Sequence, residues 1–119
     1  MSEAETNQRN QAIGSLMYAD GDIKAEPMCA TDIYTEKCAV SVYAKDLATM
    51  AATLAIGGKN PVSASVVVSP GTVQHTLAVM TIAGLYDDSG KWLYHTGLPA
   101  KSGVEGGIIA VDQAGSASP

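Results

Sequence analysis

The segment from Ala44 to Ala55 limits what this chain can fold into more than any other stretch. Its apolar residues recur at the spacing of one face of an α-helix, at Leu47, Met50, Ala51, Leu54 and Ala55. Good helix formers fill the positions between them, and Gly57 and Gly58 follow as a stop signal. The pattern therefore predicts a helix over residues 44–55.

Residues 3–19 predict another helix. Its apolar stripe consists of Ala12, Ile13, Leu16 and Met17. Ser2 precedes this segment as a plausible N-cap, and Gly21 stands just past its end. A short helix over residues 31–38 is expected after a break at Pro27, because apolar positions there again lie four apart.

A fourth helix is predicted to begin at Ser69 and Pro70, which read as N-cap and first helical position. It is expected to run to about Ala83. The residues that hold its helical period are Val73, Leu77, Met80 and Ile82 or Ala83.

The C-terminal third reads as a small β element. Residues 87–90, Asp-Asp-Ser-Gly, indicate a turn, and alternation over residues 91–96 predicts a strand of period two. Residues 101–103 and 108–111 would form a second strand, with antiparallel pairing to the first as one option. The expected fold class is therefore α+β, mostly helical, with a small antiparallel β element near the C-terminus.

The composition is that of a globular chain, with 46% hydrophobic and 16% charged residues among 119. We expect one domain, or part of one, over residues 1–119, with residues 112–119 as a flexible tail. No apolar run approaches the roughly 18 residues that span a bilayer. The net charge of −5 leaves no basic footprint for nucleic acid. The acidic, polar N-terminus differs from a secretory signal, which favours the cytoplasm.

The cysteines and histidines lack the spacing of a metal site. Cys29 and Cys38 lie nine positions apart, and His75 and His95 lie far from both and from each other. Zinc sites draw such ligands from closely spaced pairs. We therefore expect no metal, no cofactor and two buried thiols.

Lys101, Ser102 and Gly103 form a Lys-[Ser/Thr]-Gly triplet, which lines the active-site edge in serine β-lactamase-like hydrolases. Lysine offers a positive charge, serine a hydroxyl, and glycine leaves the backbone open to a substrate. A surface turn accounts for the triplet alone about equally well. The longer string GLPAKSGVEGGIIAV is more specific.

That string is one of several, in order along the chain, that resemble the C-terminal half of a bacterial-type glutaminase. The others are SEAETNQRNQAIGSLM, DIYTEKC, KDLATMAATLAIGGKNP, SPGTV and AGLYDDSGKWLYHTGLPAKSGV. The resemblance implies a partial serine β-lactamase-like fold and a role in hydrolysing L-glutamine to L-glutamate and ammonia through a serine acyl-enzyme. It also implies L-glutamine or L-glutamate as the ligand and a homo-oligomer as the assembly.

The resemblance implies substrate-binding roles for Glu3 and Asn10. The seven positions between them are two helical turns, so both would lie on one face, where a carboxylate can meet the substrate ammonium and an amide its carboxylate. A first-turn dipole charge and a solvated amide are the structural alternatives. Tyr34 matches a tyrosine that contacts the substrate, and Tyr86 one that relays a proton near the nucleophile. Packing of each ring with its hydroxyl at the surface is the alternative.

The resemblance further implies that the backbone N–H of Val104 belongs to the oxyanion hole. Such a donor is worth roughly 3 to 4 kcal/mol in the transition state. Lys101 and Ser102 match a pair that supports the site electrostatically.

Two departures from the family pattern bear on function. No serine in the sequence has a lysine three positions later, so the Ser-x-x-Lys nucleophile motif is absent, and the segment that carries it is expected on a missing N-terminal half. Glu105 stands where the family has glycine, which puts a carboxylate beside the oxyanion hole. A non-catalytic fragment that binds an amino acid or assembles with another subunit is therefore the alternative function. A penicillin-recognising relative ranks last.

Overall fold

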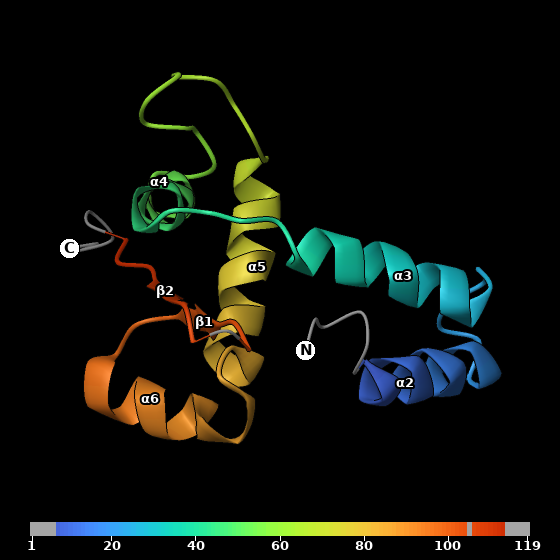
Figure 1. Ribbon diagram of the computed structural model, residues 1–119. Helices are drawn as coiled ribbons and strands as arrows, with labels where there is room; N and C mark the ends of the chain where they lie inside the picture. Colours follow the sequence, from blue (N-terminus) through green and yellow to red (C-terminus); the bar gives the residue numbers. More distant parts are fainter. Residues whose placement is uncertain (1–6, 105, 114–119) are drawn as a thin grey trace. The chain divides into compact units, whose positions relative to one another are not determined.

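The computed structural model describes residues 7–104 and 106–113 (Figure 1). Contacts divide the chain into two compact units, with the boundary between Ser41 and Val42. The elements in chain order are α2 (Gln8–Ala19), α3 (Pro27–Cys38), α4 (Ala44–Ala55), α5 (Pro70–Ala83), η1 (Tyr86–Asp88), α6 (Ser89–Thr96), β1 (Ala100–Ser102) and β2 (Ile108–Ala110). The fold class is confirmed as mostly helical with a small antiparallel sheet near the C-terminus.

The first unit pairs α2 with α3 through polar and small residues. Asn7 is buried, and its Nδ2 donates to Thr35 Oγ1 at 2.9 Å, while Thr35 Oγ1 donates to the carbonyl of Thr31 at 2.9 Å. Gly14 is buried too, and a Cβ on it would lie 2.9 Å from Thr31 Oγ1. The two helices therefore approach closely because no large side chain separates them.

The apolar stripe of α2 does not form this contact. Ile13, Leu16 and Met17 are exposed, with 51%, 62% and 39% of their surface accessible. The helical period was predicted correctly, but periodicity alone does not say which face meets a neighbour. The contact is formed instead by Asn7 with its hydrogen-bonded partner Thr35, and by Gly14 close to Thr31.

Helix α3 begins at Pro27, four residues earlier than expected. Pro27 occupies the first helical turn, and the carboxylate of Glu26 caps it by accepting from the N–H of Cys29 at 2.8 Å. Proline here starts the helix because its missing N–H needs no partner at that position. Cys29 and Cys38 are both exposed, so the expectation of buried thiols is wrong.

The Asn7–Thr35 contact should matter for stability. Thr35→Val keeps the shape but removes the acceptor of Asn7, leaving a buried amide donor unsatisfied, so unfolding free energy should fall by about 1–3 kcal/mol. Chemical denaturation measures this change. Thr76→Val is the matched control, because its hydroxyl makes the same bond to a carbonyl four residues back but at the surface. Equal losses in both variants would contradict a special role for the buried contact.

The second unit has its core on α5. Val73, Leu77 and Met80 are buried with Val111, and the partly buried residues that pack against them are Ala51, Leu54, Ala55, Val68 and Ile109. Helix α5 has the predicted bounds, and Ser69 caps it by accepting from the N–H of Thr72 at 3.2 Å. Helix α4 also has the predicted bounds, and Gly57 and Gly58 follow its end, both at positive φ. None of the helices among residues 7–104 and 106–113 is long and apolar enough to cross a membrane.

The strand expected over residues 91–96 is wrong, because these residues belong to α6. Gly97 adopts a left-handed conformation at φ 69°, and its N–H donates to the carbonyl of Leu93 at 2.8 Å, which is a helix C-cap. Four alternating residues are too few to distinguish a strand from a helix when a capping glycine follows.

Strands β1 and β2 therefore pair with each other rather than with residues 91–96. They form a two-stranded antiparallel sheet in which Lys101 lies opposite Ile109 and Ala100 opposite Ala110. The strand β1 lies against the end of α5, where the amide of Ser102 donates to the carbonyl of Gly84 at 3.0 Å. This contact fixes the hairpin on the helical core.

Candidate functional site

The Lys-Ser-Gly triplet lies on β1 and the turn that follows it. Ser102 is half-buried, and besides its backbone bond to Gly84 its hydroxyl lies 3.4 Å from the same carbonyl. Gly84 approaches so closely that an added Cβ would lie 1.7 Å from the carbonyl oxygen of Ala100. The end of α5 therefore sets the position of the triplet.

Tyr86 and Lys101 meet at this end of α5. The Lys101 Nζ lies 5.4 Å from the centre of the Tyr86 ring, within the range of a cation–π contact, and it donates to the carbonyl of Ser102. Both side chains are exposed, Tyr86 by 67%. A phenol hydroxyl, an ammonium and the Ser102 hydroxyl are thus gathered on one surface.

The backbone of Tyr86 is strained. Its φ of 49° lies in the left-handed region, which costs a non-glycine residue on the order of 1 kcal/mol. The buried hydroxyl of Ser89 holds this turn, because it accepts from the N–H of Leu85 and donates to the carbonyl of Tyr86, both at 2.8 Å. Ser89 therefore positions Tyr86, a role that its place in a turn signal did not reveal.

Val104 lies in the turn between β1 and β2. The turn is closed by the N–H of Gly103 donating to the carbonyl of Gly107 at 2.7 Å, and the Val104 side chain is 76% exposed. No bond within the described part of the hairpin uses the N–H of Val104. Glu105, the departure from the family pattern, lies outside the described residues.

The other predicted substrate contacts belong to the first unit. Asn10 is half-buried on α2, and Tyr34 is 48% exposed on α3, the helix that packs against α2. Glu3 lies outside the described residues. The structure thus gathers Tyr86, Lys101 and Ser102 in the second unit and puts Asn10 and Tyr34 on neighbouring helices of the first.

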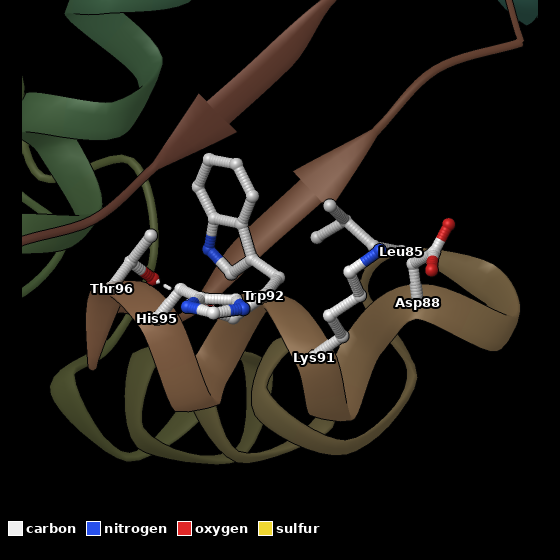
Figure 2. A pocket seen from close by; sticks show the side chains of 6 residues that line it. All are labelled: Leu85, Asp88, Lys91, Trp92, His95 and Thr96. Carbon is white, nitrogen blue, oxygen red and sulfur yellow. Dashed lines mark hydrogen bonds between the residues drawn. The ribbon is translucent and has the colours of Figure 1, made fainter.

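Residues on either side of Tyr86 in the sequence line a pocket of about 380 Å³, which the sequence did not predict. Figure 2 shows the side chains that line it, which are Leu85, Asp88, Lys91, Trp92, His95 and Thr96. The Trp92 indole donates to the carbonyl of Leu98 at 3.1 Å. Spacings of three and four positions bring Asp88, Lys91, Trp92 and His95 to one side of a helix, a signal that reading the segment as a strand concealed.

Among residues 7–104 and 106–113, no three His, Cys, Asp or Glu side chains gather as a group that could hold a metal ion. The chemistry assembled here is that of hydroxyls, an ammonium and backbone donors. Such groups bind and polarise a carbonyl or amide substrate.

A Lys-Ser-Gly triplet on a strand beside a helical core is typical of the active-site edge of serine β-lactamase-like hydrolases. The family model for glutaminase matches residues 1–116. The chain belongs to the glutaminase family.

Curated relatives agree along most of the chain. The glutaminase of Brucella suis biovar 1 (strain 1330) is 56% identical over 110 residues, and glutaminase 2 of Yersinia pestis is 49% identical over 110 residues. These alignments cover 92% of this chain but only 35% and 32% of the relatives. The chain therefore spans about a third of the length of the relatives that it matches.

Solved structures of glutaminases match the fold. The probable glutaminase ybaS is 46% identical with a TM-score of 0.88, covering 92% of this chain and 36% of that one. A probable glutaminase from Bacillus subtilis complexed with 6-diazo-5-oxo-L-norleucine is 33% identical with a TM-score of 0.84, covering 91% of this chain and 35% of that one.

Proposed function

We propose that this chain supplies substrate-binding and oxyanion-hole residues for the hydrolysis of L-glutamine to L-glutamate and ammonia. The observation that carries the proposal is the cluster of Tyr86, Lys101 and Ser102, in which Lys101 lies over the Tyr86 ring and the Ser102 amide donates to the carbonyl of Gly84. It is supported by the solved Bacillus subtilis glutaminase that reacted with 6-diazo-5-oxo-L-norleucine to form a covalent complex.

In this proposal each residue has a chemical role. The carboxylate of Glu3 meets the substrate ammonium, the amide of Asn10 binds the α-carboxylate, and the hydroxyl of Tyr34 contacts the substrate. The Val104 N–H donates to the oxygen that becomes negative when a serine attacks the side-chain amide. Tyr86 relays the proton that leaves with ammonia, while Lys101 and Ser102 stabilise charge around it.

The attacking serine comes from outside these residues. The sequence holds no Ser-x-x-Lys motif, so the acyl-enzyme forms only when another polypeptide segment supplies that serine. We further propose a homo-oligomeric assembly in the cytoplasm, as expected for a member of the glutaminase family.

The purified chain alone should release no ammonia from glutamine above the buffer rate, because removal of the nucleophile leaves only binding and oxyanion stabilisation. Enzyme-coupled ammonia detection measures this. A chimera in which this chain replaces the 110 aligned residues of the Brucella suis glutaminase is the positive control and should release ammonia. Ammonia release by the chain alone would contradict the proposal that another polypeptide segment supplies the attacking serine.

A second candidate is a non-catalytic fragment that binds an amino acid or assembles with a subunit. The observation that favours it is the number of exposed apolar side chains, including Ile33 at 64% and Leu16 at 62%. Sedimentation measures the assembly state of the chain, and a glutamine titration followed by thermal denaturation measures ligand binding. A monodisperse monomer with no glutamine-induced thermal shift would argue against both.

A further inference from the structure

The face of α2 that meets α3 consists of polar and small residues. The positions that are buried or half-buried there lie three and four apart, and they are Asn7 at the N-cap with Asn10, Gln11 and Gly14 in the helix. Every other residue of α2 is exposed. Asn10, to which the proposed function assigns the α-carboxylate of the substrate, therefore lies on the stripe that meets α3.

Two contacts hold this stripe on α3, one before Asn10 in the sequence and one after it. Asn7 Nδ2 donates to Thr35 Oγ1 at 2.9 Å. About two helical turns later, a Cβ on Gly14 would lie 2.9 Å from Thr31 Oγ1. The partner moves back along α3 while the chain advances along α2, so the two neighbouring helices of Figure 1 run antiparallel. Asn10 is therefore level with the turn of α3 between the two threonines.

Tyr34 belongs to that turn of α3. It stands between Thr31 and Thr35 in the sequence, directly before the second, and its side chain is 48% exposed. Two residues that the proposed function assigns to the substrate, Asn10 and Tyr34, thus come from facing turns of one helix pair. The spacing between them depends on how far α2 is slid along α3.

The side chain of Asn7 serves this contact and not the helix that it begins. Asparagine at an N-cap usually accepts from an N–H of the first turn. Within the described part of the chain the Asn7 side chain makes no such bond. Its Nδ2 donates to Thr35, and its Oδ1 accepts from Gln11 Nε2 at 2.8 Å. Asn7 and Thr35 are each 6% exposed, so water competes little for their bond.

We propose that Asn7 and Thr35 are positioning residues for the substrate, because their hydrogen bond fixes the register of α2 on α3. That register sets the Asn10 amide opposite the Tyr34 hydroxyl at the spacing that one amino acid requires. Small side chains alone would let the helices slide, but a hydrogen bond is satisfied only over a narrow range of distance and direction. Sliding would also leave the buried Asn7 amide without its acceptor. This inference rests on the proposed function, from which the substrate roles of Asn10 and Tyr34 are taken.

The test is steady-state kinetics of ammonia release by the Brucella suis chimera carrying Thr35→Val. KM for L-glutamine should rise by about tenfold or more, because a displaced Asn10 amide loses a charge-assisted hydrogen bond to the α-carboxylate. The value of kcat should stay within about threefold, because that carboxylate lies at the far end of glutamine from the amide that reacts. A merely destabilised protein would instead lose kcat in proportion to its unfolded fraction and keep its KM.

Matched variants assign the effect to the hydrogen bond. Asn7→Ser keeps a favourable N-cap residue but is too short to reach Thr35, so it should raise KM like Thr35→Val with the helix start intact. Thr35→Ser keeps the acceptor and should keep the parent KM. Thr76→Val removes a threonine hydroxyl at the surface of α5 and should keep it as well. Equal rises of KM in Thr35→Ser and Thr35→Val would contradict a role of the hydrogen bond.

A double-mutant cycle determines whether Thr35 acts through Asn10. Asn10→Ala alone should raise KM, because it removes the amide itself. In the double variant, the rise of KM should fall short of the product of the two single rises by about fivefold or more, because a displaced amide and a deleted one lose the same bond. Single rises that multiply in full would overturn the positioning role.

The outcomes separate this inference from the proposed function. An ammonia-releasing chimera in which Thr35→Val and Asn7→Ser leave KM unchanged would overturn the positioning role alone. A chimera that releases no ammonia but binds L-glutamate in calorimetric titration would count against the proposed hydrolysis. The Kd for L-glutamate then takes the place of KM and should rise by about tenfold in the same two variants. A chimera that neither releases ammonia nor binds L-glutamate would overturn both.

Discussion

Gly84→Ala is expected to lower the free energy of unfolding of the second unit by about 3 kcal/mol. The added methyl would lie 1.7 Å from the carbonyl oxygen of Ala100 and 2.3 Å from that of Met80, and both are backbone atoms that cannot rotate away. The carbonyl of Gly84 also accepts a hydrogen bond from the amide N–H of Ser102. Displacing Gly84 would therefore loosen the hairpin that carries the candidate site. Urea denaturation followed by circular dichroism measures the loss.

Gly71→Ala is the control for this prediction. Gly71 lies in the first turn of α5, the helix that Gly84 caps at its other end, and a Cβ there would meet nothing within 4 Å, so alanine should stabilise the helix by about 0.5–1 kcal/mol. Opposite signs at the two glycines are the expected signature of the close approach at Gly84. A neutral or stabilising Gly84→Ala would contradict the packing of β1 against the end of α5.

Tyr86→Phe should lower kcat for glutamine hydrolysis in the Brucella suis chimera by about 10²–10⁴-fold. The change removes only the hydroxyl assigned to proton transfer, a step that contributes this much in enzymes that use a positioned acid or base. The ring remains to contact the Lys101 ammonium, so the fold around it should be preserved. Steady-state kinetics of ammonia release give kcat, and thermal denaturation checks that stability is unchanged.

Tyr94→Phe is the matched control, because Tyr94 is 86% exposed on α6 and has no assigned role. Its kcat should equal that of the parent chimera. A Tyr86→Phe chimera with unchanged kcat would remove Tyr86 from the proton pathway and leave it as a packing partner of Lys101.

Helices with strong local signals were predictable from the sequence. Helix α5 begins at Pro70 and α4 ends before Gly57, as expected, because a capping serine, a proline and glycines at positive φ act within a few residues of themselves. The hairpin residues were also predicted as extended segments, because a preference for extended backbone is local as well. Their partner was assigned wrongly, because a strand's pairing depends on what lies across from it and not on its own side chains.

The candidate site was only partly predictable. The triplet at Lys101 and the tyrosine at position 86 were recognised from sequence strings, whereas Ser89 and the pocket along α6 were not. Ser89 acts through a buried hydroxyl bridge between Leu85 and Tyr86, which becomes visible only once the turn is folded. The pocket was hidden by the assignment of residues 91–96 to a strand.

The sequence by itself determined helices α4 and α5 with their ends, and the family to which the chain belongs, because periodicity, capping and motif strings are properties of neighbouring residues. Only the tertiary structure decided which faces are buried. The stripe of Ile13, Leu16 and Met17 is exposed while Asn7 and Gly14 form the contact to α3, since close approach of backbones and satisfied hydrogen bonds selected that face. Likewise, the end of α5 covers β1, because Gly84 has no side chain to keep the strand away.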